Sequence, residues 1–149
     1  VKGDDIFALG GHESFVVGYV ASAERAFMEA QGIAAANGAI TLDARLINAK
    51  KARRHEGAGN ALSKEEWLAL PKLIANPDAV LWDKGTNNIL YVFNAPKRTN
   101  KGKMVVEFAR PLKNKSPVES VRTVFYVQKN DIAGRIKGDL YQLIRGSVD

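Results

Sequence analysis

The sequence has no cysteine, only two histidines and no long apolar run, and each absence excludes a class of protein. Without cysteine there is no disulfide, no thiolate metal site and no cysteine nucleophile. No stretch reaches the roughly eighteen consecutive apolar residues of a transmembrane helix, so we expect no membrane span. P-loop, paired-glycine dinucleotide, GxSxG and HExxH motifs are also missing. Because the two histidines have no evident cluster of carboxylates around them, we expect neither a metal nor a cofactor.

What the sequence does have is an uneven distribution of charge. The chain has 149 residues, 46% hydrophobic and 26% charged, which is the composition of one globular domain. Residues 1–48 carry three positive and six negative side chains, whereas residues 49–149 carry nineteen positive and ten negative ones. A region with a net charge of +9 attracts polyanions, of which nucleic acid is the commonest. The alternative, that this charge serves only the solubility of the protein, stays open.

Helical patterns dominate the first half of the chain. Alanine and other apolar residues repeat with helical spacing within residues 15–37. Asp43 is a good N-cap for a second helix over residues 44–54, after a short extended segment. Ser63 and Glu66 form a capping box, which predicts that a third helix begins there.

Strand patterns dominate the second half. Apolar runs separated by turn residues predict strands at 79–82, 89–93, 104–109 and 121–127. Four consecutive strands indicate an antiparallel meander, so we expect an α+β fold with N-terminal helices packed on an antiparallel sheet of about four strands. We divide the chain into a helical lead-in or arm, residues 1–38, and a main domain, residues 39–149. The tail, residues 131–146, fits either a short helix or a last strand.

His55 is the first candidate for chemistry. It follows a run of cations, and on a helix Lys51 and His55 project from one face. A nearby cation lowers an imidazole pKa and favours a neutral base, whereas a helix C-terminus acts in the opposite direction. Lys51, Arg53 and Arg54 are also suited to hold a phosphate. The alternative is a solvated basic helix end, and we regard His12, in a glycine-flanked segment, as incidental.

Residues 121–127 form the second candidate, because a strand sends alternate side chains to opposite faces. Alternation places Thr123 and Phe125 on one face and Arg122 and Tyr126 on the other, unless a bulge re-aims one of them. A hydroxyl or a guanidinium on the open face of the sheet would suit a scissile phosphate. An ordinary amphipathic strand explains the same pattern, because Thr and Tyr are good strand formers.

Taken in order, these segments resemble a known family. The matching segments are Lys51–His55, Leu70–Trp82 with its Asn-Pro-Asp, Leu90–Phe93, Val105–Phe108 and Val121–Phe125. They resemble the C-terminal nuclease-like domain of phage Mu-type head morphogenesis proteins, within the barnase–EndoU–colicin–RelE superfamily of metal-independent ribonucleases. The resemblance covers about residues 39–149.

The resemblance implies a curved antiparallel sheet behind N-terminal helices, with the site on the open face of the sheet. It implies that His55 is the acid/base and that Thr123 is the polar residue on the strand. Charge and geometry add Arg122 and Lys51. With one good histidine, the second proton-transfer group would be Tyr126, Lys51 or the substrate itself. The predicted substrate-binding residues are Arg53, Arg54, Arg122, Lys101 and Lys103.

The resemblance also implies a biological setting. We expect a phage or prophage toxin or effector that cleaves RNA, such as tRNA, by 2′-hydroxyl transesterification without a metal. Its partners would be an immunity or antitoxin protein and phage or prophage head proteins. It would act in the bacterial cytoplasm after delivery by a phage particle or a secretion system.

An alternative function belongs to a different class. The domain would be a non-catalytic module of a phage head morphogenesis protein that binds nucleic acid or an acidic protein surface. Phosphates would then be neutralised by two basic segments, Lys97–Lys103, which contains Lys101 and Lys103, and Lys113–Lys115. Such binding would weaken steeply with salt. An ADP-ribosyl transferase is disfavoured because its Arg, Ser-Thr and Glu-x-Glu series is missing.

Overall fold

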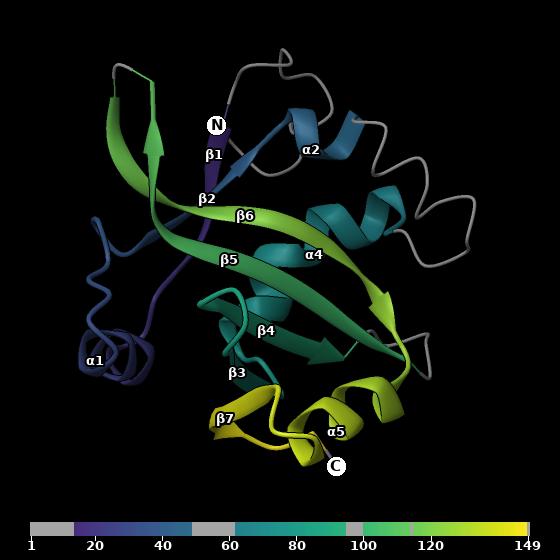
Figure 1. The fold of residues 1–149 in the computed structure, drawn as a ribbon. Helices are drawn as coiled ribbons and strands as arrows, with labels where there is room; N and C mark the ends of the chain where they lie inside the picture. Colours follow the sequence, from purple (N-terminus) through teal and green to yellow (C-terminus); the bar gives the residue numbers. More distant parts are fainter. Residues whose placement is uncertain (1–13, 49–61, 95–99, 114, 149) are drawn as a thin grey trace.

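The computed structural model describes residues 14–48, 62–94, 100–113 and 115–148, and these residues form one seven-stranded mixed sheet (Figure 1). The strands are β1 (Ser14–Tyr19), β2 (Ala39–Asp43), β3 (Ala79–Asp83), β4 (Asn88–Asn94), β5 (Lys101–Leu112), β6 (Lys115–Val127) and β7 (Tyr141–Gly146). The described helices are α1 (Ser22–Ala30), α2 (Arg45–Asn48), α4 (Lys64–Ala75) and α5 (Lys129–Lys137). The strand order is β1-β2-β6-β5-β4-β3-β7, and every pair is antiparallel except β2 with β6.

The prediction of an antiparallel sheet of about four strands, preceded only by helices, is wrong. Strands β3 to β6 do follow one another as antiparallel hairpins, but β1, β2 and β7 extend the sheet at both ends. Part of the predicted helix 15–37 is strand β1, because aromatic and β-branched residues pair there with β2 and favour a strand. The tail forms both predicted alternatives, helix α5 and then strand β7.

Helix α4 begins where the sequence predicts. The Ser63 hydroxyl accepts a hydrogen bond from the Glu66 amide at 3.2 Å, and the Glu66 carboxylate accepts one from the Ser63 amide at 2.8 Å. This capping box satisfies amides that the first turn leaves without partners. Pro71 lies inside the helix, which continues to Ala75.

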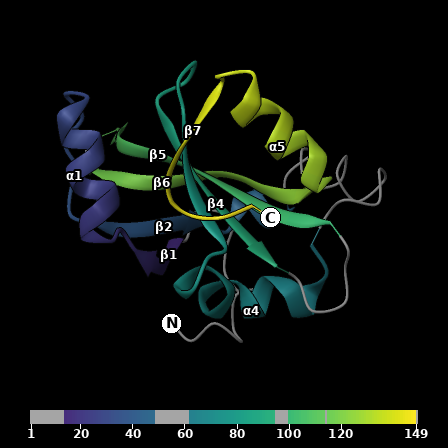
Figure 2. The same cartoon turned by 90° about the horizontal axis from the view of Figure 1, so that it is seen from below.

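The two faces of the sheet differ in what covers them. Figure 2 shows α4 and α5 on opposite sides of the strands. The face towards α4, here called the α4 face, carries the main core, in which Trp67, Leu70 and Ile74 of the helix pack against the strands. On the opposite face, Ile132 of α5 packs with Leu90 and neighbouring apolar residues at the β3–β4 end. The β2, β6 and β5 part of that face is here called the polar face.

The N-terminal part shares the main core. Val17, Val20 and Met28 are buried in the same cluster as the α4 side chains. Glu24 of α1 is fully buried, and its carboxylate accepts hydrogen bonds from the Tyr91 hydroxyl at 3.3 Å and from Arg145 of β7. The division of the chain into an arm, residues 1–38, and a main domain, residues 39–149, stays a prediction.

One glycine is required by a close approach between strands. Gly102 of β5 pairs with Phe93 of β4, whose ring is 1% exposed. A Cβ atom at Gly102 would lie 2.1 Å from Phe93 Cε2, so any larger residue would displace the ring. No helix in the described part of the chain is long and apolar enough to cross a membrane.

Candidate functional site

A β-bulge in β6 brings the two polar residues of the second candidate to one face. Val105 of β5 pairs with Thr123, and the next residue, Val106, pairs with Val121, so Arg122 is an extra residue on β6. Val121 and Val124, three residues apart, both enter the main core on the α4 face. Arg122 and Thr123 therefore both lie on the polar face.

The Arg122 side chain confirms this placement. Its Nε atom lies 3.6 Å from Glu107 Oε1. The side chains of Val106 and Phe108, on either side of Glu107 along β5, are in the main core, so the Glu107 side chain lies on the opposite face. Simple alternation, which sends Arg122 to the face opposite Thr123, is thus wrong at this point of the strand. The bulge was the exception that the sequence left open.

A polar groove lies where β2, β5 and β6 meet the start of α2. Its volume is about 480 Å³. Its polar lining consists of five cations, three hydroxyls and one carboxylate: Arg45, Arg110, Lys113, Lys115, Arg122, Ser14, Thr41, Ser120 and Asp43. Four apolar residues complete the lining: Leu46, Leu112, Val118 and Val121. We call it the β2–β6 groove. Five cations against one carboxylate make it a site for an anion.

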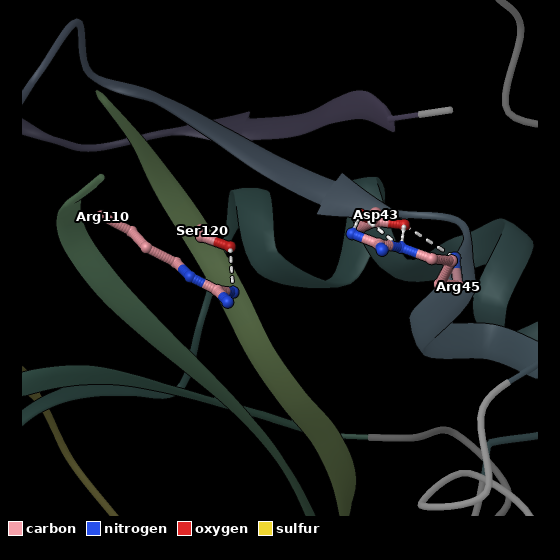
Figure 3. A network of polar contacts seen from close by, with 4 residues as sticks. All are labelled: Asp43, Arg45, Arg110 and Ser120. Atoms are coloured by element: carbon pink, nitrogen blue, oxygen red, sulfur yellow. Dashed lines mark hydrogen bonds and ion pairs between the residues drawn. The ribbon is translucent and has the colours of Figure 1, made fainter. Parts of the chain in front are cut away.

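The two arginines in Figure 3 differ in what neutralises them. The Arg45 guanidinium binds the Asp43 carboxylate, with Nη2 2.7 Å from Oδ2, and this hydrogen bond raises the pKa of Arg45. Arg110 instead reaches across β6, with Nη1 3.5 Å from the Ser120 hydroxyl oxygen. Within the described ranges Arg110 has no carboxylate partner. Arg110 is therefore the arginine whose charge is available to a ligand.

A buried carboxylate next to the groove holds its backbone. Glu119 is fully buried, and its Oε1 accepts hydrogen bonds from the amides of Ala36 at 2.5 Å and Ala109 at 3.1 Å. Its Oε2 accepts from the amides of Asn37 at 3.1 Å and Gly38 at 2.8 Å. Ala109 has a positive φ of 49°, which few non-glycine residues adopt. Glu119 thus fixes the irregular turn of β5 immediately before Arg110.

The other described residues predicted for the site do not join this group. Tyr126 is buried on the α4 face, and its hydroxyl donates to Glu66 Oε2 at 2.5 Å, so the sheet separates it from Thr123. Lys101 binds the Asp78 carboxylate at 2.6 Å and is 14% exposed. The structure brings together Thr123 and Arg122, and not Tyr126 or Lys101.

Lys103 lies at the far end of the polar face, in a separate cleft beside Tyr141. The remaining predicted residues, Lys51, Arg53, Arg54 and His55, lie outside the described residues, and their roles stay predictions. Sequence reasoning missed Arg110, Ser120 and Glu119. Their contacts depend on the irregular register of the β5–β6 hairpin and, for Glu119, on the distant residues 36–38, and no local signal in the sequence reveals them.

Comparison with known proteins gives the family. The model of the phage MuF C-terminal domain matches residues 51–142. The chain belongs to this family. It is also 31% identical, over 106 residues, to the Mu-like prophage FluMu F protein of Haemophilus influenzae. The match covers 70% of this chain and 25% of that protein, so the chain spans about a quarter of the curated relative's length. No solved structure matches.

The comparisons confirm the phage part of the predicted resemblance. The ribonuclease superfamily, which the resemblance implies, remains a prediction. Among the residues that the structure describes, no three His, Cys, Asp or Glu side chains form a group that could hold a metal ion.

Proposed function

We propose that this MuF C-terminal domain cleaves RNA as a metal-independent endoribonuclease and that the β2–β6 groove binds the RNA backbone. The observation that carries the proposal is the set of polar groups on one face of the sheet. Arg110 lies without a carboxylate partner among the described residues, beside the Ser120 hydroxyl. The bulge places Arg122 in the groove lining and the buried Thr123 behind it on the same face. A guanidinium presents a planar fork of N–H donors that fits two phosphate oxygens.

Cleavage of RNA needs no nucleophile from the protein, because the ribose supplies its own 2′-hydroxyl. A general base removes the proton of the 2′-hydroxyl, the O2′–P bond forms and the P–O5′ bond breaks. A general acid protonates the departing 5′-oxygen, which leaves a 2′,3′-cyclic phosphate and a 5′-hydroxyl. Negative charge grows on the phosphate oxygens in the transition state, so a preorganised guanidinium stabilises it more than the ground state. We assign that role to Arg110.

The sequence supplies the proton-transfer group. His55 is the residue whose ordinary pKa suits acid/base transfer near neutral pH, and such transfer typically contributes a factor of about 10²–10⁴. Tyr126 is a poorer second group, since it is buried on the α4 face and its hydroxyl is bound to Glu66. We therefore keep Lys51 or the substrate as the second proton-transfer group.

The family suggests the setting. As a phage domain, such an enzyme would act as a toxin or effector on bacterial RNA such as tRNA, and an immunity or antitoxin protein would protect the producing cell. The domain would travel with the phage head and act in the bacterial cytoplasm.

The groove also fits a second function, a non-catalytic module for nucleic acid or an acidic protein during head morphogenesis. The observation that favours it is the exposure of Lys113 and Lys115 at the tip of the β5–β6 hairpin, where they bind phosphate without any chemistry. Binding of this kind weakens steeply with salt.

One experiment separates the two functions. Total RNA is incubated with the purified chain in excess EDTA, and the ends of the products are analysed. We expect 2′,3′-cyclic phosphate ends, and a loss of cleavage by a factor of about 10² or more in Arg110→Gln. The matched control is Lys72→Gln on the exposed side of α4, which removes one positive charge away from the groove.

Each alternative outcome has a clear meaning. Salt-sensitive RNA binding without cleavage, lost in Arg110→Gln, would establish the non-catalytic module. Equal cleavage by Arg110→Gln and Lys72→Gln would show that the groove is not the site.

A further inference from the structure

A second cleft lies at the other end of the polar face, where β5 and β6 meet α5 and β7. Its volume is about 520 Å³. We call it the Lys103 cleft, and its polar and aromatic lining includes Asn100, Lys103, Phe125, Asp131, Arg135 and Tyr141. These residues come from three parts of the chain that the fold brings together.

Two cations and two aromatic rings meet in this cleft. Lys103 Nζ donates to the Tyr141 hydroxyl at 3.3 Å and lies 4.9 Å from the centre of the Phe125 ring. The Arg135 guanidinium carbon lies 5.7 Å from the centre of the Tyr141 ring. Both cations therefore approach the same tyrosine.

Neither Lys103 nor Arg135 forms an ion pair with a residue that the structure describes. Burial, followed by repulsion from Arg135, lowers the pKa of Lys103, although Asp83 and Asp131 partly oppose the effect. Burial also raises the pKa of Tyr141, so its hydroxyl keeps its proton and can donate. Asp131 lines the cleft but makes no ion pair with the residues that the structure describes.

Lys103 is half-buried and Arg135 is exposed, and an anion that joins the two cations offsets their repulsion. A phosphate accepts hydrogen bonds from an ammonium, a guanidinium and a phenol at once. The aromatic wall beside these groups suits the apolar side of a ribose or a base. The cleft therefore has the groups that a nucleotide needs.

We propose that the Lys103 cleft binds a nucleotide, with its phosphate held by Lys103, Arg135 and the Tyr141 hydroxyl and its sugar or base against Phe125. In the proposed ribonuclease this cleft is a subsite for the RNA substrate, and that part of the inference rests on the proposed function. Lys103 and Arg110 are seven residues apart on β5, a separation on the order of 20 Å. One strand of RNA along the polar face would therefore reach both the cleft and the groove.

The test measures the binding of adenosine 3′-monophosphate to the whole chain by calorimetry, and locates it from NMR shifts of backbone amides. We expect Lys103→Met and Arg135→Gln each to weaken binding at least tenfold. Lys129→Gln, an exposed charge on the same helix as Arg135, is the matched control and should bind as the wild type does. Arg135 is exposed, so its variant keeps the test sound if Lys103→Met does not fold.

Two further probes define the ligand. Adenosine, which has no phosphate, should not bind. Inorganic phosphate should bind more weakly than the nucleotide, and equally tight binding would overturn the assignment to a nucleotide. Unchanged affinity in both cleft variants, or shifts confined to the β2–β6 groove, would overturn the site itself.

The outcomes also separate this inference from the proposed function. RNA cleavage by a wild-type chain that does not bind the nucleotide in this cleft would leave the ribonuclease standing and remove the subsite. Nucleotide binding in the cleft without any RNA cleavage would leave the nucleotide site standing and remove the ribonuclease.

Discussion

Replacing Glu119 with glutamine tests how the groove is held. The Glu119 carboxylate accepts four backbone hydrogen bonds, two on each oxygen, from Ala36, Ala109, Asn37 and Gly38. Glutamine keeps one acceptor oxygen, so two amides lose their acceptor and face an NH₂ group instead. A hydrogen bond to a charged group contributes about 1.5–3 kcal/mol, so the loss of two lowers the free energy of unfolding by about 3 kcal/mol or more. For a domain of this size that lowers Tm by about 6–12 °C.

The assay is urea unfolding followed by circular dichroism, with a thermal scan beside it. The control is Glu29→Gln, an exposed carboxylate on α1, for which we expect a change within about 0.5 kcal/mol. RNA binding by Glu119→Gln should also fall, because Ala109 and Arg110 lose their support. A loss of less than about 1 kcal/mol for Glu119→Gln would refute the assignment of these four hydrogen bonds as the anchor of the groove.

Four further substitutions test other parts of the structure. Arg145→Met leaves the fully buried Glu24 carboxylate without its guanidinium, so urea unfolding should show a loss of about 3 kcal/mol, and a loss near zero would contradict the role of that pair. Gly102→Ala should cost about 1–3 kcal/mol because its Cβ meets a buried ring, whereas Gly134→Ala, inside α5 with nothing within 4 Å, should gain about 0.5–1 kcal/mol. The folded-state pKa of Lys103 lies below its unfolded value of 10.5, so the unfolded chain binds more protons and the charged lysine destabilises the fold at neutral pH. The wild type should therefore gain stability relative to Lys103→Met as the pH rises through the folded-state pKa towards 10.5, and a difference that does not change with pH would contradict the lowered pKa.

Local signals in the sequence predicted the elements that are stabilised locally. The capping box at Ser63 and Glu66 begins α4, and the hairpins from β3 to β6 follow the alternation of apolar residues and turns. Each of these elements has its partner next to it in the sequence, so composition and spacing are enough to reveal it.

The outer strands β2 and β7 pair with distant segments. The sequence indicated a short extended segment before Asp43 and a strand as one alternative for the tail, but it did not reveal that either joins the sheet. β2 pairs in parallel with β6, and β7 pairs with β3, across long stretches of chain. β1 lies in a segment whose later alanines repeat with helical spacing, so a single helix was predicted where the chain forms a strand and then α1. Tertiary pairing there decides the structure against the local pattern.

The candidate site depends on strand register in the same way. The sequence singled out Arg122 and Thr123 as candidates, yet only the register of β5 against β6 shows that a bulge places them on one face. Arg110 gains its significance from the Ser120 hydroxyl of the neighbouring strand and from Glu119 behind it. No spacing rule joins these residues, because their contact depends on irregular pairing between two strands.

The most direct test of the central claim compares two histidine variants in one RNA cleavage assay with excess EDTA. We predict that the wild type and His12→Ala produce fragments with 2′,3′-cyclic phosphate ends at similar rates. The cleavage rate of His55→Ala should be lower by a factor of at least about 100. Cleavage that needs an added divalent ion, or equal rates for the two variants, would contradict a metal-independent ribonuclease that uses His55.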